Sequence, residues 1–152
     1  MAEESVVTDE MRAAIGTQSE PTVIEIEKGM IRKHAEAVED PNPLWQDGEY
    51  ARRARYGGMV ASPGLLTCVM MMGERVQLPF QLPFLRVLDG GGEWEFFQPI
   101  RPGDVLTVTN KLVNLRERTG KSGKMVFTIT ETTWKNQRDE VVARAQGTII
   151  MY

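Results

Sequence analysis

The residues best suited to chemistry are Asp40 and Asn42, which lie in the run Asp40-Pro41-Asn42-Pro43. A carboxylate can take up or give up a proton during a reaction, and a neighbouring amide can position the groups that react. Two prolines this close must end a preceding helix, and aspartate is also common in turns for backbone reasons alone. The sequence therefore leaves two roles open for both residues, an acid–base site or a turn. His34 is the single imidazole, and its place six residues before Asp40 in a helical pattern favours a structural role.

A second feature is the apolar run 63–76, which follows a helix-start signal at Ser62-Pro63. Its residues are apolar on all sides, so this helix is expected to be buried all round. The run holds 14 residues, whereas a membrane span needs about 20. We predict a central helix that the remaining chain wraps, with Cys68 as a buried structural thiol. Core packing is the expected role of Met70, Met71 and Met72 on such a helix.

The elements predicted around this helix follow from hydrophobic spacing. Shorter helices are predicted at 11–15, 28–39 and 47–55, and strands at 22–27, 85–88, 92–98, 105–115, 125–134 and 141–151. Helices come first and a meander of long antiparallel strands follows, which indicates an α+β fold. We expect one domain over residues 1–152, with residues 1–8 as a flexible N-terminus.

Composition excludes several classes of function. The 152 residues are 41% hydrophobic and 26% charged, and 18 basic against 21 acidic residues give a net charge of −3 without a basic stripe. Nucleic-acid binding therefore has little support. One histidine and one cysteine exclude zinc sites built from clusters of these residues, so we expect no metal and no cofactor. The N-terminus lacks the charge and hydrophobic pattern of a signal peptide, which predicts a cytoplasmic protein.

Three segments, in order and at matching spacing, carry a family resemblance. They are AEAVEDPNPLW at 35–45, GGMVASPG at 57–64 and PIRPGD at 99–104. Together they resemble MaoC-like hydratases and dehydratases, and most of all the FAS1-like dehydratase branch, also called the MaoC-type N-terminal domain. The resemblance covers about residues 8–152. It implies a single hotdog fold, in which a curved antiparallel sheet of five to six strands wraps a long central helix.

The resemblance also implies an activity and a site. The family hydrates trans-2-enoyl thioesters or dehydrates (R)-3-hydroxyacyl thioesters, carried on CoA or acyl carrier protein. Asp40 falls on the catalytic aspartate, and Asn42 follows as in the motif. Trp45 stands where the family has its catalytic histidine, and an indole nitrogen donates a hydrogen bond but cannot act as a base. Gly64 falls on the donor to the thioester oxygen, and Trp45, Ser62 and Met72 fall beside the substrate. Met70, Met71 and Met72 could then line an adaptable acyl tunnel instead of only packing in the core.

We therefore expect an acyl-binding, non-catalytic partner of a second hotdog subunit that carries the intact Asp/His pair. The assembly would be a heterodimer or heterotetramer in fatty acid metabolism, or a homodimer when the chain is alone. One alternative is an active homodimeric hydratase that uses Asp40. Others are a non-enzymatic acyl-thioester-binding or scaffold module and a thioesterase, which is ranked low because the helix carries only one carboxylate, Glu74.

Overall fold

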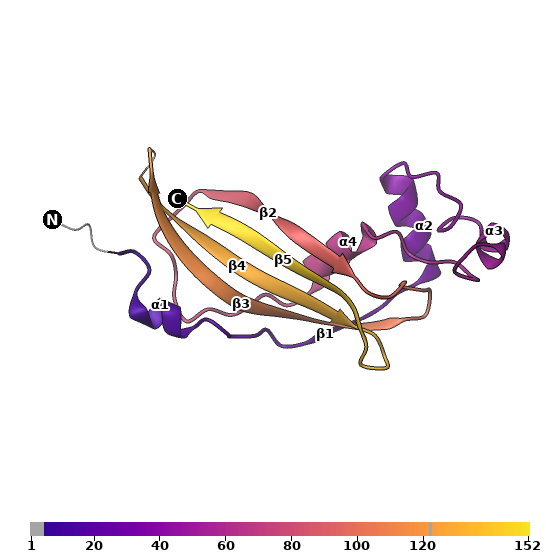
Figure 1. Ribbon diagram of the computed structural model, residues 1–152, viewed down its shortest axis with the longest axis horizontal. Helices are drawn as coiled ribbons and strands as arrows, with labels where there is room; N and C mark the ends of the chain where they lie inside the picture. Colours follow the sequence, from indigo (N-terminus) through magenta and orange to yellow (C-terminus); the bar gives the residue numbers. More distant parts are fainter. Residues whose placement is uncertain (1–4, 122) are drawn as a thin grey trace.

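A curved antiparallel sheet forms the body of the molecule (Figure 1). The computed structural model describes residues 5–121 and 123–152, and within them five strands make one sheet in the order β1-β3-β4-β5-β2. The strands are β1 (Thr22–Glu25), β2 (Val87–Phe96), β3 (Val105–Gly120), β4 (Gly123–Lys135) and β5 (Val141–Met151). The predicted α+β hotdog architecture is confirmed.

The long strands follow the predicted alternation of apolar and polar residues. Directly opposite residues of neighbouring strands share a face of the sheet, so Trp134 lies beside Val108 on one side and Ala143 on the other. All three side chains are buried in the main core. Residues 116–120, predicted as part of a turn over 116–123, instead continue β3, because Arg116 pairs with Phe127 and Gly120 pairs with Gly123. Residue 122 of that turn lies outside the described residues.

The triple glycine at 90–92 does not separate two strands as predicted. It forms a bulge inside β2, where the register with β5 shifts between Asp89 and Gly92 and Gly91 adopts a φ of 86°. A Cβ at Gly92 would lie 2.8 Å from the carbonyl oxygen of Gln146, so only glycine fits this close approach. The bulge lets β2 bend while the residues on both sides of it stay paired with β5.

The described residues contain four helices, which lie mostly at the ends of the sheet (Figure 1). They are α1 (Asp9–Ala13), α2 (Lys28–Ala37), α3 (Gly48–Arg53) and α4 (Leu65–Met72). In Figure 1, α2 and α3 lie beyond one end of the sheet and α1 lies at the other end. Helix α4 is the predicted central helix, but its N-cap is Gly64, two residues after the predicted cap Ser62.

Helix α4 ends four residues earlier than predicted, because the sheet captures the chain at this point. Gly73 is extended, with φ −77° and ψ 156°. The next peptide unit is bound by the sheet, since the N–H of Glu74 donates to Thr22 Oγ1 at 2.9 Å and Asn110 Nδ2 donates to the Glu74 carbonyl at 2.7 Å. The apolar residues that follow pack as an extended loop rather than as further helical turns.

The expectation of a helix buried on all sides is wrong for the single chain. Leu66 and Val69 are fully buried against the sheet, but Met71 and Met72 are 82% and 58% exposed and Cys68 is also exposed. One sheet can cover only one side of a helix. The other side of α4 remains an exposed apolar surface, and such surfaces often mark an interface.

The start of the described chain is held by one carboxylate of β3. Glu117 Oε2 accepts the N–H of Val6 at 2.8 Å, the N–H of Val7 at 3.1 Å and the hydroxyl of Ser5 at 2.8 Å. Val7 is 2% exposed in a second core cluster. The hydrogen bond from Val7, then that from Ser5, lower the pKa of Glu117 from 4.5 to about 2.

This depressed pKa predicts an acid-dependent release of the segment. Because the folded pKa lies below the unfolded one, the contribution of Glu117 is fully present above about pH 4.5 and is lost as the pH falls toward about 2. In an NMR titration, the Val6 and Val7 amide shifts should move with a midpoint near 2. In Glu117→Ala these amides should exchange with solvent roughly tenfold faster. A midpoint near 4.5 would contradict the assignment.

Candidate functional site

The predicted catalytic pair, Asp40 and Asn42, shapes a turn. Asp40 Oδ1 accepts the N–H of Asn42 at 3.0 Å, and Asn42 Oδ1 accepts the N–H of Leu44 at 3.0 Å. Each side chain thus binds a backbone N–H two residues later, as in an Asx turn. The backbone of Asp40 is tied on both sides, by its N–H to the Ala35 carbonyl at 2.9 Å and by its carbonyl to the Gln46 side chain.

His34 lies against the start of α4, a contact that sequence analysis missed. Its Nδ1 is 3.1 Å from the Oγ of Ser62, which is 7% exposed. A Cβ built on Gly64 would lie 3.3 Å from His34 Cε1 and 3.6 Å from Nε2, so the imidazole lies beside this glycine. His34 stands out in the sequence as the single histidine, but this does not reveal its partner, because 28 residues separate it from Ser62. The only imidazole of the chain therefore adjoins the predicted thioester-binding residue.

Gly64 presents a backbone donor at the start of α4. Its N–H makes no hydrogen bond to any residue in the described part of the chain, whereas the N–H groups of Leu65 and Leu66 bond to Ser62 and Pro63. The glycine is exposed, so the donor is accessible. A helix N-terminus carries partial positive charge, and a free N–H there can stabilise an oxygen on which negative charge develops.

The side chain of Trp45 is partly buried. Its side chain packs against the main core cluster, and its Nε1 is buried with no partner among the described residues. The neighbouring Leu44 carbonyl accepts the N–H of Val60 at 3.5 Å, which places the 40–45 turn beside the segment that leads to α4. The indole therefore fills space where the motif has an ionisable ring.

The third motif segment joins the same region. Arg101 donates to the Tyr56 carbonyl at 2.7 Å, and the Ala61 N–H donates to the Ile100 carbonyl at 2.8 Å. A Cβ at Gly58 would lie 3.4 Å from the Arg101 guanidinium. The segments 40–45, 57–64 and 99–104 are therefore adjacent in space, although up to 64 residues separate their ends.

A cavity lies at the opposite end of α4. It has a volume of 890 Å³ and lies between the concave face of the sheet and the loop that follows α4. Met70 and Met71 line it, but Met72, which was predicted to contact substrate, does not, and neither do Ser62 and Gly64. In the described residues there is no group of three or more His, Cys, Asp or Glu side chains placed to hold a metal. The described helices are also too short or too polar to cross a membrane.

The sequence is similar to a known protein family and to several known proteins. Residues 13–145 match the family described as FAS1-like, dehydratase domain region. A UPF0336 protein of Streptomyces avermitilis is 34% identical over 110 residues, which cover 70% of this chain and 73% of that protein. A probable enoyl-CoA hydratase alpha subunit of Thermomonospora curvata is 27% identical over 139 residues, which cover 81% of this chain and 44% of that protein.

The fold has solved counterparts. The chain resembles a chain of the ChsH1-ChsH2 complex from Mycobacterium tuberculosis with a TM-score of 0.77 and 23% identity, over 97% of this chain and 89% of that chain. This likeness establishes the shared fold. The matched region includes all three motif segments and extends from α1 into β5. The chain therefore belongs to the FAS1-like dehydratase-domain family of MaoC-like hotdog proteins.

Proposed function

We propose that this chain is the acyl-binding subunit of an enoyl-thioester hydratase or (R)-3-hydroxyacyl-thioester dehydratase. The observation that carries the proposal is the combination of a free Gly64 N–H at the start of α4 with Trp45 in place of an ionisable ring. The chain keeps a donor for the thioester oxygen and lacks the motif imidazole. The acid–base work then falls to a second hotdog subunit that has both aspartate and histidine.

The proposed step is the addition of water across the double bond next to the thioester. The partner's base removes a proton from water as the oxygen attacks the β-carbon, and its acid returns a proton to the α-carbon. Negative charge gathers on the thioester oxygen between these events, and the Gly64 N–H stabilises it. The subunit name of the Thermomonospora relative and the solved two-component complex support a two-chain enzyme.

The β2 edge supports a different chain, rather than a second copy, as the partner. β2 ends the sheet, and Val87, Leu88, Phe96 and Phe97 are about half exposed there. An uncovered edge strand with apolar neighbours invites pairing. We propose that the partner's edge strand continues the sheet at β2.

Self-pairing at this edge would bring like charges together. Trp94 lies on the concave face, opposite buried Ala145, so Glu93 and Glu95 point from the other face. In a two-fold symmetric, antiparallel pair, opposite residues share a face, so centres at residues 93 to 95 give Glu93–Glu93, Glu93–Glu95 or Glu95–Glu95 pairs. Like charges directly opposite are destabilising. The proposed partner therefore carries neutral or basic residues opposite these two positions.

The full chain, assayed alone and with its partner, tests the proposal. Alone, we expect negligible hydration of crotonyl-CoA or a longer enoyl-CoA; with a second hotdog subunit that has the Asp/His pair, we expect turnover. In the lone chain, Trp45→His should raise activity above wild type, because an imidazole can act as a base where an indole cannot. Trp45→Phe is the matched control. Robust hydration by the wild-type chain alone would refute the non-catalytic role.

A second candidate function is catalysis by this chain itself. It is favoured by one observation, the contact of His34 with Ser62 and Gly64. His34 would then serve as the base beside the thioester oxygen. The same assay separates the candidates, since His34→Gln should abolish any activity of the lone chain under this second function and should leave partner-dependent turnover largely intact under the first.

A further inference from the structure

Both walls of the 890 Å³ cavity carry apolar and polar residues. The loop wall is mostly apolar, with Val76, Leu78 and Phe80, and it also carries Arg75 and Gln81. The sheet wall carries hydroxyl groups of Thr128 and Thr130, which line the cavity from β4. A plain hydrocarbon tunnel would be served better by valine or isoleucine at these strand positions, which have the same branching and no polar atom.

The free hydroxyls are distinct from a satisfied polar pair beside them. Thr132, one step further along the same face of β4, donates to Asn110 Oδ1 at 2.6 Å, and Asn110 in turn binds the Glu74 carbonyl. Thr128 and Thr130 make no side-chain hydrogen bond to any described residue, although both are half-buried. Covering them with a purely apolar chain would remove their water and supply no replacement, which is unfavourable.

Space is available beside one of these hydroxyls. Gly147 on β5 lies directly opposite Thr130 and also lines the cavity. A Cβ at Gly147 would meet no atom within 4 Å, and the glycine needs no left-handed conformation. The missing side chain therefore leaves room next to Thr130 for a substituent on a bound chain.

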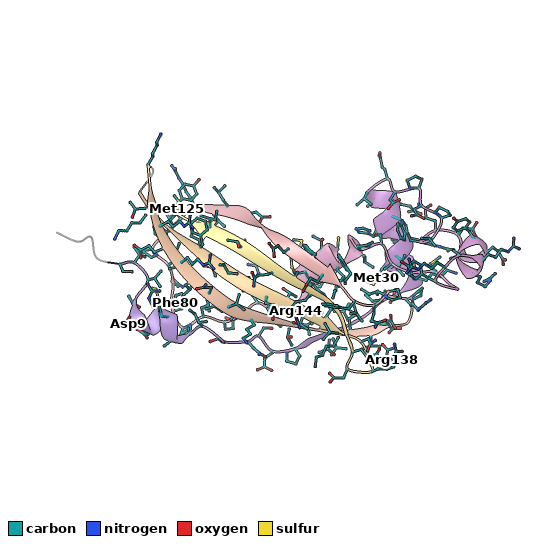
Figure 2. The ribbon with its side chains drawn as sticks, in the orientation of Figure 1. Asp9, Met30, Phe80, Met125, Arg138 and Arg144 are labelled. Carbon is teal, nitrogen blue, oxygen red and sulfur yellow. The ribbon has the colours of Figure 1, made fainter. Side chains whose placement is uncertain are left out.

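The cavity is remote from the thioester-binding end of α4. The helix from Gly64 to Met71 spans roughly 10 Å at about 1.5 Å per residue, and Met71 rather than Gly64 borders the cavity. Figure 2 shows Phe80, from the loop wall, at the α1 end of the sheet and Met30, from α2, at the opposite end. A ligand that reaches from Gly64 into the cavity must be a long chain, and its middle carbons then pass Thr128 and Thr130.

We propose that the cavity selects long acyl chains that carry an oxygen substituent, a hydroxyl or a carbonyl, near mid-chain. A threonine hydroxyl both donates and accepts hydrogen bonds, so either substituent finds a partner at Thr128 or Thr130. The mostly apolar loop wall covers the rest of the chain, and the space at Gly147 accommodates the substituent. This inference rests on the proposed acyl-binding function and adds a specificity to it.

The test compares octadecanoyl-CoA with octadecanoyl-CoAs that carry one hydroxyl at successive carbons in the middle of the chain. Affinity for the full-length protein is measured by isothermal titration calorimetry. At the best position, we expect the hydroxylated chain to bind roughly fivefold more tightly than the plain chain, the effect of about one net hydrogen bond. Thr128→Val with Thr130→Val should remove this preference and leave binding of the plain chain equal or tighter.

Two further variants distinguish a specific loss of the preference from a general loss of folding. Thr133→Val makes the same change on the opposite face of β4 and should keep the preference, and Gly147→Val should weaken hydroxylated chains more than the plain chain. Equal affinity for plain and hydroxylated chains at every position, unchanged by the threonine variants, would overturn this inference alone. Failure of every acyl-CoA to bind would overturn the acyl-binding proposal and this inference with it.

Discussion

Replacing Trp134 by alanine is expected to lower the stability of the fold by about 3–5 kcal/mol, the usual cost of deleting a buried aromatic side chain. Trp134 is fully buried in the main core and stacks on Trp94 with ring centroids 5.3 Å apart. A domain of this kind is stable by only about 5–15 kcal/mol. The melting temperature should therefore fall by roughly 10–15 °C, measured by circular dichroism.

The matched variant Trp134→Phe should cost much less. The indole Nε1 is buried without a partner among the described residues, so phenylalanine removes an unsatisfied donor as well as volume. Met71→Ala, at a site 82% exposed, should stay within about 0.5 kcal/mol of wild type. If Trp134→Ala also stayed within that range, Trp134 would not be the centre of the core.

Two chains with opposite charges at the β2 edge should form a dimer. A Glu93→Lys/Glu95→Lys variant mixed with wild-type chain is expected to associate roughly tenfold more tightly than either chain with itself, because opposite charges replace like charges across the strand pair. Each such pair contributes about 0.2–1 kcal/mol. Sedimentation velocity of the two chains, separate and mixed, measures the effect.

The salt dependence of this association gives a second readout. The advantage of the mixture should shrink as ionic strength rises, because exposed charges are screened. A Glu10→Lys/Glu20→Lys variant, with the same charge change at exposed positions distant from β2 in sequence, should give no advantage on mixing. If wild-type chain alone formed a tight dimer at low salt, the argument against self-pairing at β2 would fail.

The sheet was predictable because its signal is local. Residues 125–134 and 141–151 are rich in β-branched residues, and both segments became strands close to the predicted bounds. The extension of β3 and β4 to Gly120 and Gly123 was not predictable, because pairing with the opposite strand maintains these polar residues. Hydrophobic alternation predicts the half-buried part of a strand and does not predict a part that is polar on both faces.

The length of α4 was mispredicted for a physical reason. The apolar run continues past Gly73, so periodicity alone extends the helix to residue 76. The hydrogen bonds of Glu74 to Thr22 and Asn110 end it, and these partners are 52 and 36 residues distant in sequence. The contact of His34 with Ser62 escaped prediction in the same way. In both cases tertiary contacts, rather than local preference, decide the outcome.

The N-terminal segment that Glu117 anchors is connected to the cavity through a shared core cluster. Val7 shares its core cluster with the loop residues Leu78, Phe80 and Leu82, which belong to the mostly apolar loop wall. The segment therefore packs against the loop residues that form the wall, although it contributes no lining residue of its own. Removal of Val6 and Val7 should therefore loosen this wall and change the shape of the cavity.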